Sequence, residues 1–371
     1  MTLRILLLVA DQGACGLYRM IMPARAAAAS GNSDLEIFVA EGLLGKHHRE
    51  PDGTLVCDYV APVDMDIVVY QRPMTDSLVS TIPLIQAQGC TVIVELDDDI
   101  VNVPTHNLAY DLVHPRINRT FNWQFLREAC KLADWMTCTT PALGERYMPG
   151  RHTVVPNYVP TSLVQFQASS SLGKSPEEIV LGWSGSMAVH AMDLQETQNA
   201  IPIVLHETDC EFLVVGESAR TGAALGLSKD PAETGWIPLP EYPEYLAKLD
   251  VGIVPLVGDR FNQAKSWLKG MEMAALGIPF VASPVTEYVR LHNEYHIGIL
   301  ASKQRDWVRE LKRLVIEDEY RSDVSGRGRA LVQERLTIEG NVGRWIEAWH
   351  TARNVAHRRT LHGATSTPVS P

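Results

Sequence analysis

The sequence contains no apolar run that reaches the ~18 residues of a membrane-spanning helix. Its first residues, MTLRILLLVAD, have an apolar core of about six residues that an acid follows at once, which favours a first β-strand over a signal peptide. We therefore expect a chain without a membrane span.

Several motifs with a defined chemistry are also missing. The six cysteines are scattered, with no CxxC pair and no zinc-finger spacing. This pattern argues against a structural zinc site and favours free thiols in a reducing cytoplasm, where we expect the protein to reside. The nucleophile motif GxSxG is absent too, and no context pairs a cysteine with a histidine. Nothing therefore supports nucleophilic hydrolysis.

An excess of positive charge is missing as well. The formal net charge of −11 argues against a protein that coats nucleic acid through its overall field, although a local basic groove stays open. The hydrophobic share of 46% and charged share of 21% are typical of a soluble globular protein. At 371 residues, the chain has room for two domains of ~150 residues each.

Short β-branched runs alternate with helical patterns along most of the chain, which predicts parallel sheets covered on both faces. In the first half the expected strands are 3–10, 35–40, 66–71, 91–96, 135–140 and 152–155, with helices at 17–30, 75–88 and 118–133. In the second half they are 178–186, 211–216, 234–238, 250–256 and 279–283, with helices at 190–206, 241–249, near 265–276 and from 303 to about 354.

A Ser-rich stretch flanked by proline interrupts this rhythm and predicts a linker between two α/β domains. The expected parts are a first domain, a linker, a second domain, a C-terminal helix and a flexible tail: 1–160, 161–177, 178–335, 336–354 and 355–371. Ligands bind such folds at the carboxyl ends of the strands, so we expect a cleft between the domains.

The stretch FNQAKSWLKGMEMAALGIPFVAS, residues 261–283, suggests a helix with a charged face. Lys265, Lys269 and Glu272 fall at i, i+4 and i+7, and so would share one stripe of a helix. Gly277 stands where the helix would end, and Pro279 follows. The spacing alone favours the plainer interpretation, a solvated face that holds one ion pair.

Two strand-end loops are candidate anion sites, because a helix N-terminus attracts negative charge. The first is GACGLYR, which contains Gly16 and Arg19, and the second is GWSGSMAVHAMDL, which contains Gly185, Ser186 and His190. The alternatives are an ordinary βα turn for the first loop and a helix-surface histidine for His190.

Three consecutive carboxylates, Asp97, Asp98 and Asp99, follow a predicted strand in VELDDDI. Crowded like charges raise one another's pKa. The run could bind a metal, accept a proton from a hydroxyl, or cap the following turn. We expect no metal.

Four segments in order resemble GT-B-fold glycosyltransferases of the retaining, family-4-like group (glycosyltransferase group 1 type). They are TTPALGERYMPGRHTVVPNYVP, IVLGWSGSMAVHAMDL, TGWIPLPEYPEYLAKLDVGIVPL and NQAKSWLKGMEMAALGIPFVAS. The resemblance implies an α/β GT-B fold with two facing Rossmann-like, doubly wound domains and a cleft between them. It also implies that the C-terminal helix packs back across both domains.

The resemblance further implies a donor site for a nucleotide sugar on the second domain. Glu272 would hold the ribose hydroxyls, and Lys265 with the Ser266 backbone N–H would hold the diphosphate. Lys269 would reach the same phosphates or pair with Glu272. Ile237 would lie where a strand end meets the base. In this family a second glutamate often precedes the ribose ligand, at the place that Ala264 takes here.

The remaining donor contacts are expected from Gly16, Arg19, Gly185 and Ser186, and the catalytic candidates are Asp98, Asp99 and His190. The predicted activity is transfer of a hexosyl or pentosyl group from a UDP- or GDP-sugar to an acceptor hydroxyl, with retention and without a metal or another cofactor. The acceptor is left open between a glycan, a protein and a modified nucleic-acid base. A nucleotide-sugar epimerase and a degenerate nucleotide- or glycan-binding module are the alternatives.

Overall fold

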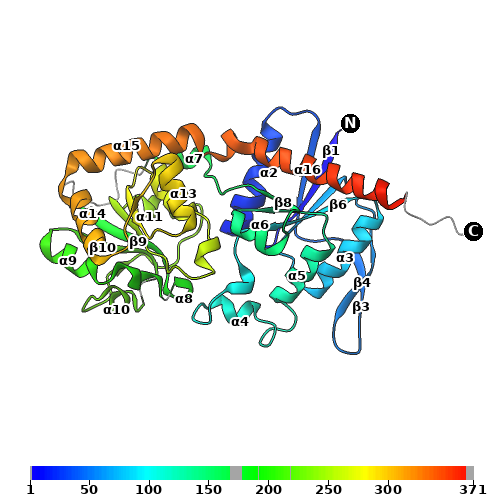
Figure 1. Ribbon diagram of the computed structural model, residues 1–371, viewed down its shortest axis with the longest axis horizontal. Helices are drawn as coiled ribbons and strands as arrows, with labels where there is room; N and C mark the ends of the chain where they lie inside the picture. The colour runs from blue at the N-terminus through cyan, green and yellow to red at the C-terminus, as the bar shows by residue number, and fades with distance from the viewer. Residues whose placement is uncertain (1, 168–177, 191, 218, 365–371) are drawn as a thin grey trace, which may run out of the picture. The chain divides into compact units, whose positions relative to one another are not determined.

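A computed structural model describes residues 2–167, 178–190, 192–217 and 219–364. The chain divides into two compact units. The first comprises residues 1–101, 111–157 and 341–371, and the second comprises residues 102–110 and 158–340. Each unit contains a parallel sheet of six strands, and Figure 1 shows each sheet enclosed by helices of its own unit.

The sheet of the first unit has the strand order β2-β1-β5-β6-β7-β8. Its strands are β1 (Leu3–Leu8), β2 (Leu35–Ala40), β5 (Ile67–Gln71), β6 (Thr91–Leu96), β7 (Trp135–Cys138) and β8 (His152–Val154). Of the interior strands, β5, β6 and β7 are buried along their whole length. Continuous apolar runs form such strands because both faces of a parallel sheet are covered.

The helices of this unit follow the strands in the βα pattern. They are α1 (Ala14–Gly16), the π-helix η1 (Leu17–Ile21), α2 (Met22–Ala29), α3 (Asp76–Ala87), α5 (Trp123–Leu132), α6 (Pro141–Tyr147) and most of α16 (Ile338–Ala364). Thr75, Asn122 and Thr140 cap α3, α5 and α6 with their side-chain oxygens. Such caps satisfy backbone N–H groups that have no partner within the helix.

The second sheet has the order β11-β10-β9-β12-β13-β14. Its strands are β9 (Val180–Ser186), β10 (Glu211–Glu217), β11 (Ala232–Glu233), β12 (Val251–Val254), β13 (Phe280–Ala282) and β14 (Ile299–Leu300). The accompanying helices are α7 (Thr161–Val164), α8 (Met187–His190), η3 (Asp193–Thr197), α9 (Ala200–Glu207), α10 (Thr221–Leu225), α11 (Tyr242–Leu246), η4 (Asn262–Ala264), α12 (Leu268–Ala275), α13 (Thr286–Tyr295), α14 (Gln304–Ile316) and α15 (Asp318–Arg335).

Helix α12 ends as the sequence predicts. Gly277 has a φ of +78°, a left-handed conformation that glycine adopts without a steric penalty. The N–H groups of Gly277 and Ile278 donate to the carbonyls of Ala274 and Met273, at 3.0 and 2.9 Å. This is the Schellman ending, in which the last carbonyls of the helix receive donors from the turn.

The start of α12 differs from the prediction. The helix begins at Leu268, and Lys265 lies before it in an extended conformation after the short turn η4. Lys265 therefore does not share a helical stripe with Lys269 and Glu272. The three charges still interact, because Lys265 and Glu272 both act on the charge of Lys269.

Other boundaries also differ. A two-stranded antiparallel hairpin, β3 (Gly45–Arg49) with β4 (Leu55–Val60), occupies a stretch for which we expected no strand. The strand expected at 234–238 is instead β11, which ends at Glu233. Helix α7 lies within the expected linker, of which 168–177 are outside the described residues, and α16 continues to Ala364 rather than ending at 354. Of the expected tail, 365–371 are outside the described residues.

The chain passes between the units within η2 (Ile100–Asn102), within α4 (Ala109–Val113) and near the start of α16. Among the residues described, no helix is long and apolar enough to cross a membrane.

Candidate active site

The candidate site of the second unit is built at the carboxyl ends of β9 and β12. Strand β9 ends in Gly185 and Ser186, and α8 follows directly. The Ala188 N–H donates to the Ser186 hydroxyl at 3.2 Å, and that hydroxyl lies 3.4 Å from Glu217 Oε2. Gly185 and Ser186 thus form the turn from strand to helix, as expected from their position in the sequence.

His190 ends α8 and is held by Asp193. Its Nδ1 lies 2.7 Å from Asp193 Oδ2, and the other oxygen of Asp193 accepts hydrogen bonds from the Val257 N–H and the Asn262 amide at 2.9 and 2.8 Å. Burial, followed by the positive charge of Lys269, lowers the pKa of His190 to about 4. Burial raises the pKa of Asp193, but its interactions with His190, the Val257 N–H and Lys269 together outweigh burial, and the net shift is downward. The pair is therefore a neutral imidazole beside a carboxylate at neutral pH.

Two lysines add positive charge to the same place. Lys269, in the first turn of α12, has its Nζ 5.3 Å from the centre of the Trp183 ring. Lys265 has its Nζ 4.7 Å from the centre of the Phe261 ring. Burial, and then the charge of Lys265, lowers the pKa of Lys269 to about 8. The two lysines therefore place their positive charges close to each other within the second unit.

Glu272 lies one turn further along α12 and is only 8% exposed. Its charge helps to hold the proton on Lys269. The hydroxyl of Tyr242 lies 2.8 Å from the Ser184 hydroxyl. Glu272 also acts on Tyr242, because burial and then the charge of Glu272 raise the pKa of this tyrosine. Glu272 is therefore a buried carboxylate that lies among hydroxyls and an ammonium group. Ala264, at the place where a second glutamate was considered, is fully buried.

The two other residues predicted for this unit lie in irregular segments. Ser266 is half-buried and directly precedes Trp267, the residue before α12. Ile237 is half-buried in the loop from β11 to α11, where the N–H groups of Thr234 and Gly235 bond to the carbonyls of Val214 and Gly216. This loop extends the edge of the second sheet.

The predicted residues in the first unit have other partners. The N–H groups of Gly13 and Gly16 both donate to Asp11 Oδ1, at 2.8 and 3.3 Å. A Cβ at Gly16 would lie 1.8 Å from the backbone oxygen of Asp11, so only glycine fits. The side chain of this chain's own Asp11 occupies the N–H groups that we expected to face a bound anion.

Arg19 is 2% exposed and belongs to a structural network. Its Nε donates to Glu95 Oε1 at 2.7 Å, and its Nη1 donates to the Val155 carbonyl at 2.8 Å and to Asn157 Oδ1 at 3.1 Å. The guanidinium also lies 5.6 Å from the Trp345 ring. These contacts place the Arg19 guanidinium against Pro156 and Asn157, where the range 111–157 of the first unit ends.

The three aspartates after β6 have different partners. Asp97 lies 3.8 Å from Arg72 Nε, whereas Asp99 is fully buried and accepts bonds from Arg146 and, at 2.9 Å, from the Tyr147 hydroxyl. Asp98, between them, is half-buried, and its carbonyl accepts from the Ile100 N–H at 3.0 Å. Within the described residues, no group of three or more His, Cys, Asp or Glu side chains could hold a metal ion.

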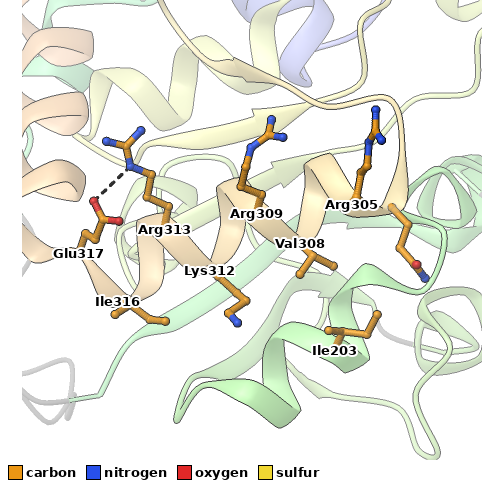
Figure 2. A pocket seen from close by; sticks show the side chains of 9 residues that line it. Ile203, Arg305, Val308, Arg309, Lys312, Arg313, Ile316 and Glu317 are labelled. Carbon is orange, nitrogen blue, oxygen red and sulfur yellow. Dashed lines mark hydrogen bonds and ion pairs between the residues drawn. The ribbon is translucent and has the colours of Figure 1, made fainter.

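A separate pocket of about 600 Å³ lies between α9 and α14. Figure 2 shows Arg305, Arg309 and Arg313 on one side of α14. Their charges are largely compensated, because Arg309 contacts Asp306 and Glu310, and Arg313 contacts Glu317 at 3.1 Å. None of the residues predicted from the sequence lines this pocket.

Comparisons with known proteins agree with this architecture. Residues 178–317 match the family model of Glycosyl transferases group 1. The structure is similar to sucrose-phosphate synthase from Thermosynechococcus elongatus, with a TM-score of 0.61 and 13% identity over 95% of this chain and 99% of that one. HepE from Anabaena, solved with UDP, is similar with a TM-score of 0.61 and 13% identity, over 95% of this chain and 100% of that one. A glycosyltransferase from Rickettsia africae is similar with a TM-score of 0.64 and 12% identity, over 95% of this chain and 98% of that one. No curated protein matches the sequence.

The chain therefore has the GT-B fold, with two parallel-sheet Rossmann-like domains. Within its second unit, residues 178–317 are the part of the chain that matches the group 1 glycosyl transferase family.

Sequence reasoning missed several residues of the site. Trp183 and Tyr242 carry no sequence signal that separates them from ordinary core residues, because aromatic side chains in strands and helices are often buried. Asp193 was visible three residues after His190, a spacing that brings side chains together on a helical turn. Asn262 gave no signal of its own.

Proposed function

We propose that this protein is a glycosyltransferase, which transfers a sugar from a UDP- or GDP-sugar to an acceptor hydroxyl and holds the donor in its second unit. The observation that carries the proposal is the convergence of Lys265, Lys269 and neutral His190 with buried Glu272 at one sheet edge. The solved complex of the similar HepE with UDP favours UDP as the nucleotide.

The two lysines suit a diphosphate. Lys269 has a lowered pKa because its charge is buried beside that of Lys265, and a bound dianion would relieve this repulsion. The departing nucleotide diphosphate develops negative charge during transfer. Cations placed in advance stabilise that charge without reorganisation. The backbone N–H of Ser266, before α12, would add a donor.

Glu272 suits the ribose of the nucleotide. A carboxylate can accept hydrogen bonds from two vicinal hydroxyls at once. Its burial keeps bulk water from competing, so ligand hydroxyls that donate to the carboxylate would be bound selectively. Ile237, on the loop after β11, would pack against the base.

His190 suits the sugar. Because Asp193 is ionised, the hydrogen bond between them places the imidazole proton on Nδ1 and leaves Nε2 as an acceptor. Nε2 would accept from a sugar hydroxyl and orient the donor. We further propose retention of the anomeric configuration, with the leaving phosphate assisting the acceptor hydroxyl. Asp98 is the proposed acceptor-side carboxylate, and Asp99, which is tied to Arg146, would position its loop.

Isothermal titration calorimetry tests the donor site. We expect wild-type protein to bind UDP or GDP and one of their sugars, and Lys265→Met to lose at least tenfold in affinity. The matched control is Lys248→Met in the same unit, whose Nζ lies 4.6 Å from the Tyr245 ring and outside the site. Failure of the folded wild-type protein to bind any nucleoside diphosphate or nucleotide sugar would overturn the proposal.

A further inference from the structure

The first unit carries an exposed apolar turn for which the donor site has no use. It comprises residues 112–121, between α4 and α5. Leu112, Ile117 and Phe121 are 57%, 56% and 39% exposed. Large apolar side chains scattered singly over a surface need no explanation, but a contiguous group marks an interaction site.

Asn118 holds these three positions together. Its amide donates to the Leu112 carbonyl at 3.0 Å, and its Oδ1 accepts from the Phe121 N–H at 3.0 Å. The Asn122 amide, 2% exposed, donates to the Asn118 carbonyl at 3.0 Å, and its Oδ1 accepts from the Gln124 N–H of α5 at 2.9 Å. The backbone of Asn122 donates to the Met74 carbonyl at 2.9 Å. The turn is therefore a built element that is anchored to the unit and presents apolar side chains to solvent.

The charge around the apolar turn is opposite to that of the chain. Residues 111–127 contain three arginines and one aspartate, whereas the whole chain has a net charge of −11. Arg116 and Arg119 flank Ile117 and are exposed. In the described part of the chain, neither forms an ion pair with a carboxylate, unlike the arginines of α14.

These features fit an anionic membrane surface better than a nucleic acid. Single-stranded nucleic acid is bound by stacking on exposed aromatic rings. Here the centre of the Trp123 ring lies 6.2 Å from that of the His114 ring and 5.9 Å from Arg127 Cζ. Phe121, which is 39% exposed, is therefore the aromatic ring that this turn presents to solvent. Aliphatic side chains with flanking arginines instead match the acyl and phosphate layers of a bilayer. We propose that the apolar turn docks this glycosyltransferase on a bilayer that contains anionic phospholipid.

Co-sedimentation of the full chain with vesicles tests this proposal without donor or acceptor, so its result is independent of the proposed function. The vesicles contain phosphatidylcholine alone or mixed with phosphatidylglycerol. We expect binding to the mixed vesicles that weakens with salt, and weak binding to phosphatidylcholine alone. Arg116→Gln with Arg119→Gln should lower the partition coefficient about 30-fold, since each arginine near such a surface contributes ~1 kcal/mol.

Ile117→Ser with Phe121→Ser should lower the partition coefficient by about tenfold or more, because two apolar side chains leave the interface. The matched controls are Leu44→Ser, 82% exposed in the same unit, and Arg25→Gln, exposed on α2. Both should bind like wild type, and all variants should melt at the wild-type temperature. Equal binding to both vesicle types, or equal losses in the controls, would overturn the proposal. So would tight binding to single-stranded DNA that the same substitutions remove.

Discussion

The Nζ of Lys269 lies 5.3 Å from the centre of the Trp183 ring, inside the second unit. The face of a tryptophan attracts a cation, but it does not replace the water that the ammonium loses on burial. The pKa of Lys269 consequently falls to about 8. An anionic ligand reverses this balance, because it favours the charged form of the lysine.

Nucleotide affinity should therefore depend on pH. Below pH 8 Lys269 is charged in the free protein and attracts the diphosphate; above pH 8 it loses its proton, and the Kd for UDP or GDP should rise by up to tenfold per pH unit for one linked proton. Calorimetry from pH 7 to pH 9.5 measures this. Lys269→Arg keeps its charge and should show a flat profile. An unchanged slope in this variant would assign the proton to another group.

Glu272→Gln should weaken binding of a nucleoside diphosphate by roughly 10–100-fold, since hydrogen bonds to a charged group contribute about 1.5–3 kcal/mol. The loss should be specific to the ribose. Wild-type protein should lose affinity for the 2′-deoxy nucleotide by a similar factor, and the variant should lose little further. Glu241→Gln, in an exposed loop of the same unit, is the matched control. Additive losses from substitution and deoxygenation would contradict a ribose contact.

Arg19→Met should destabilise the protein by about 3–5 kcal/mol, because it leaves Glu95 as an unpaired buried charge. Denaturant unfolding measures this. Adding Glu95→Leu should restore part of the loss, since a buried ion pair can be replaced by apolar side chains. At temperatures where the variant is folded, its nucleotide affinity should equal that of wild type. A weakened affinity without a loss of stability would show instead that Arg19 touches the donor.

Gly277→Ala should destabilise the protein by about 1 kcal/mol or more, because alanine is strained at a φ of +78°. The added Cβ would also lie 3.1 Å from the Ser325 hydroxyl of α15. Gly258→Ala is the control, since a Cβ there meets nothing within 4 Å and its φ lies outside the left-handed range. Similar midpoints for both variants in urea would argue against strain at this turn.

The sheets could be predicted from the sequence because each strand is a short apolar run with a clear end. Expected strands such as 91–96 coincide with observed ones, and the turn at Gly277 follows from its glycine. The hairpin of β3 and β4 was missed because apolar and polar residues do not alternate regularly along its strands. Strand β3 is also exposed along its whole length. Its packing against α3 is a tertiary effect that no local pattern reports.

The site was predictable only where local spacing specifies contacts. Lys269 and Glu272 lie one turn apart on α12, so their proximity follows from helical geometry. The partners of Arg19 do not, because Glu95 and Asn157 are 76 and 138 residues away in the sequence. A buried arginine that holds together distant segments has the same sequence signature as one that awaits a phosphate.

The division of the chain determines the order in which its parts can be completed on a ribosome. The first unit contains residues from both ends of the chain, including Trp345 against Arg19 and Arg353 paired with Asp66 at 2.6 Å. Every residue of the second unit has been synthesised once residue 340 is added. The second unit can therefore finish folding while the first unit, which was begun earlier, still awaits its last helix. A ribosome stalled once residue 340 has left the exit tunnel should present a protease-resistant second unit and a first unit that is still open to cleavage.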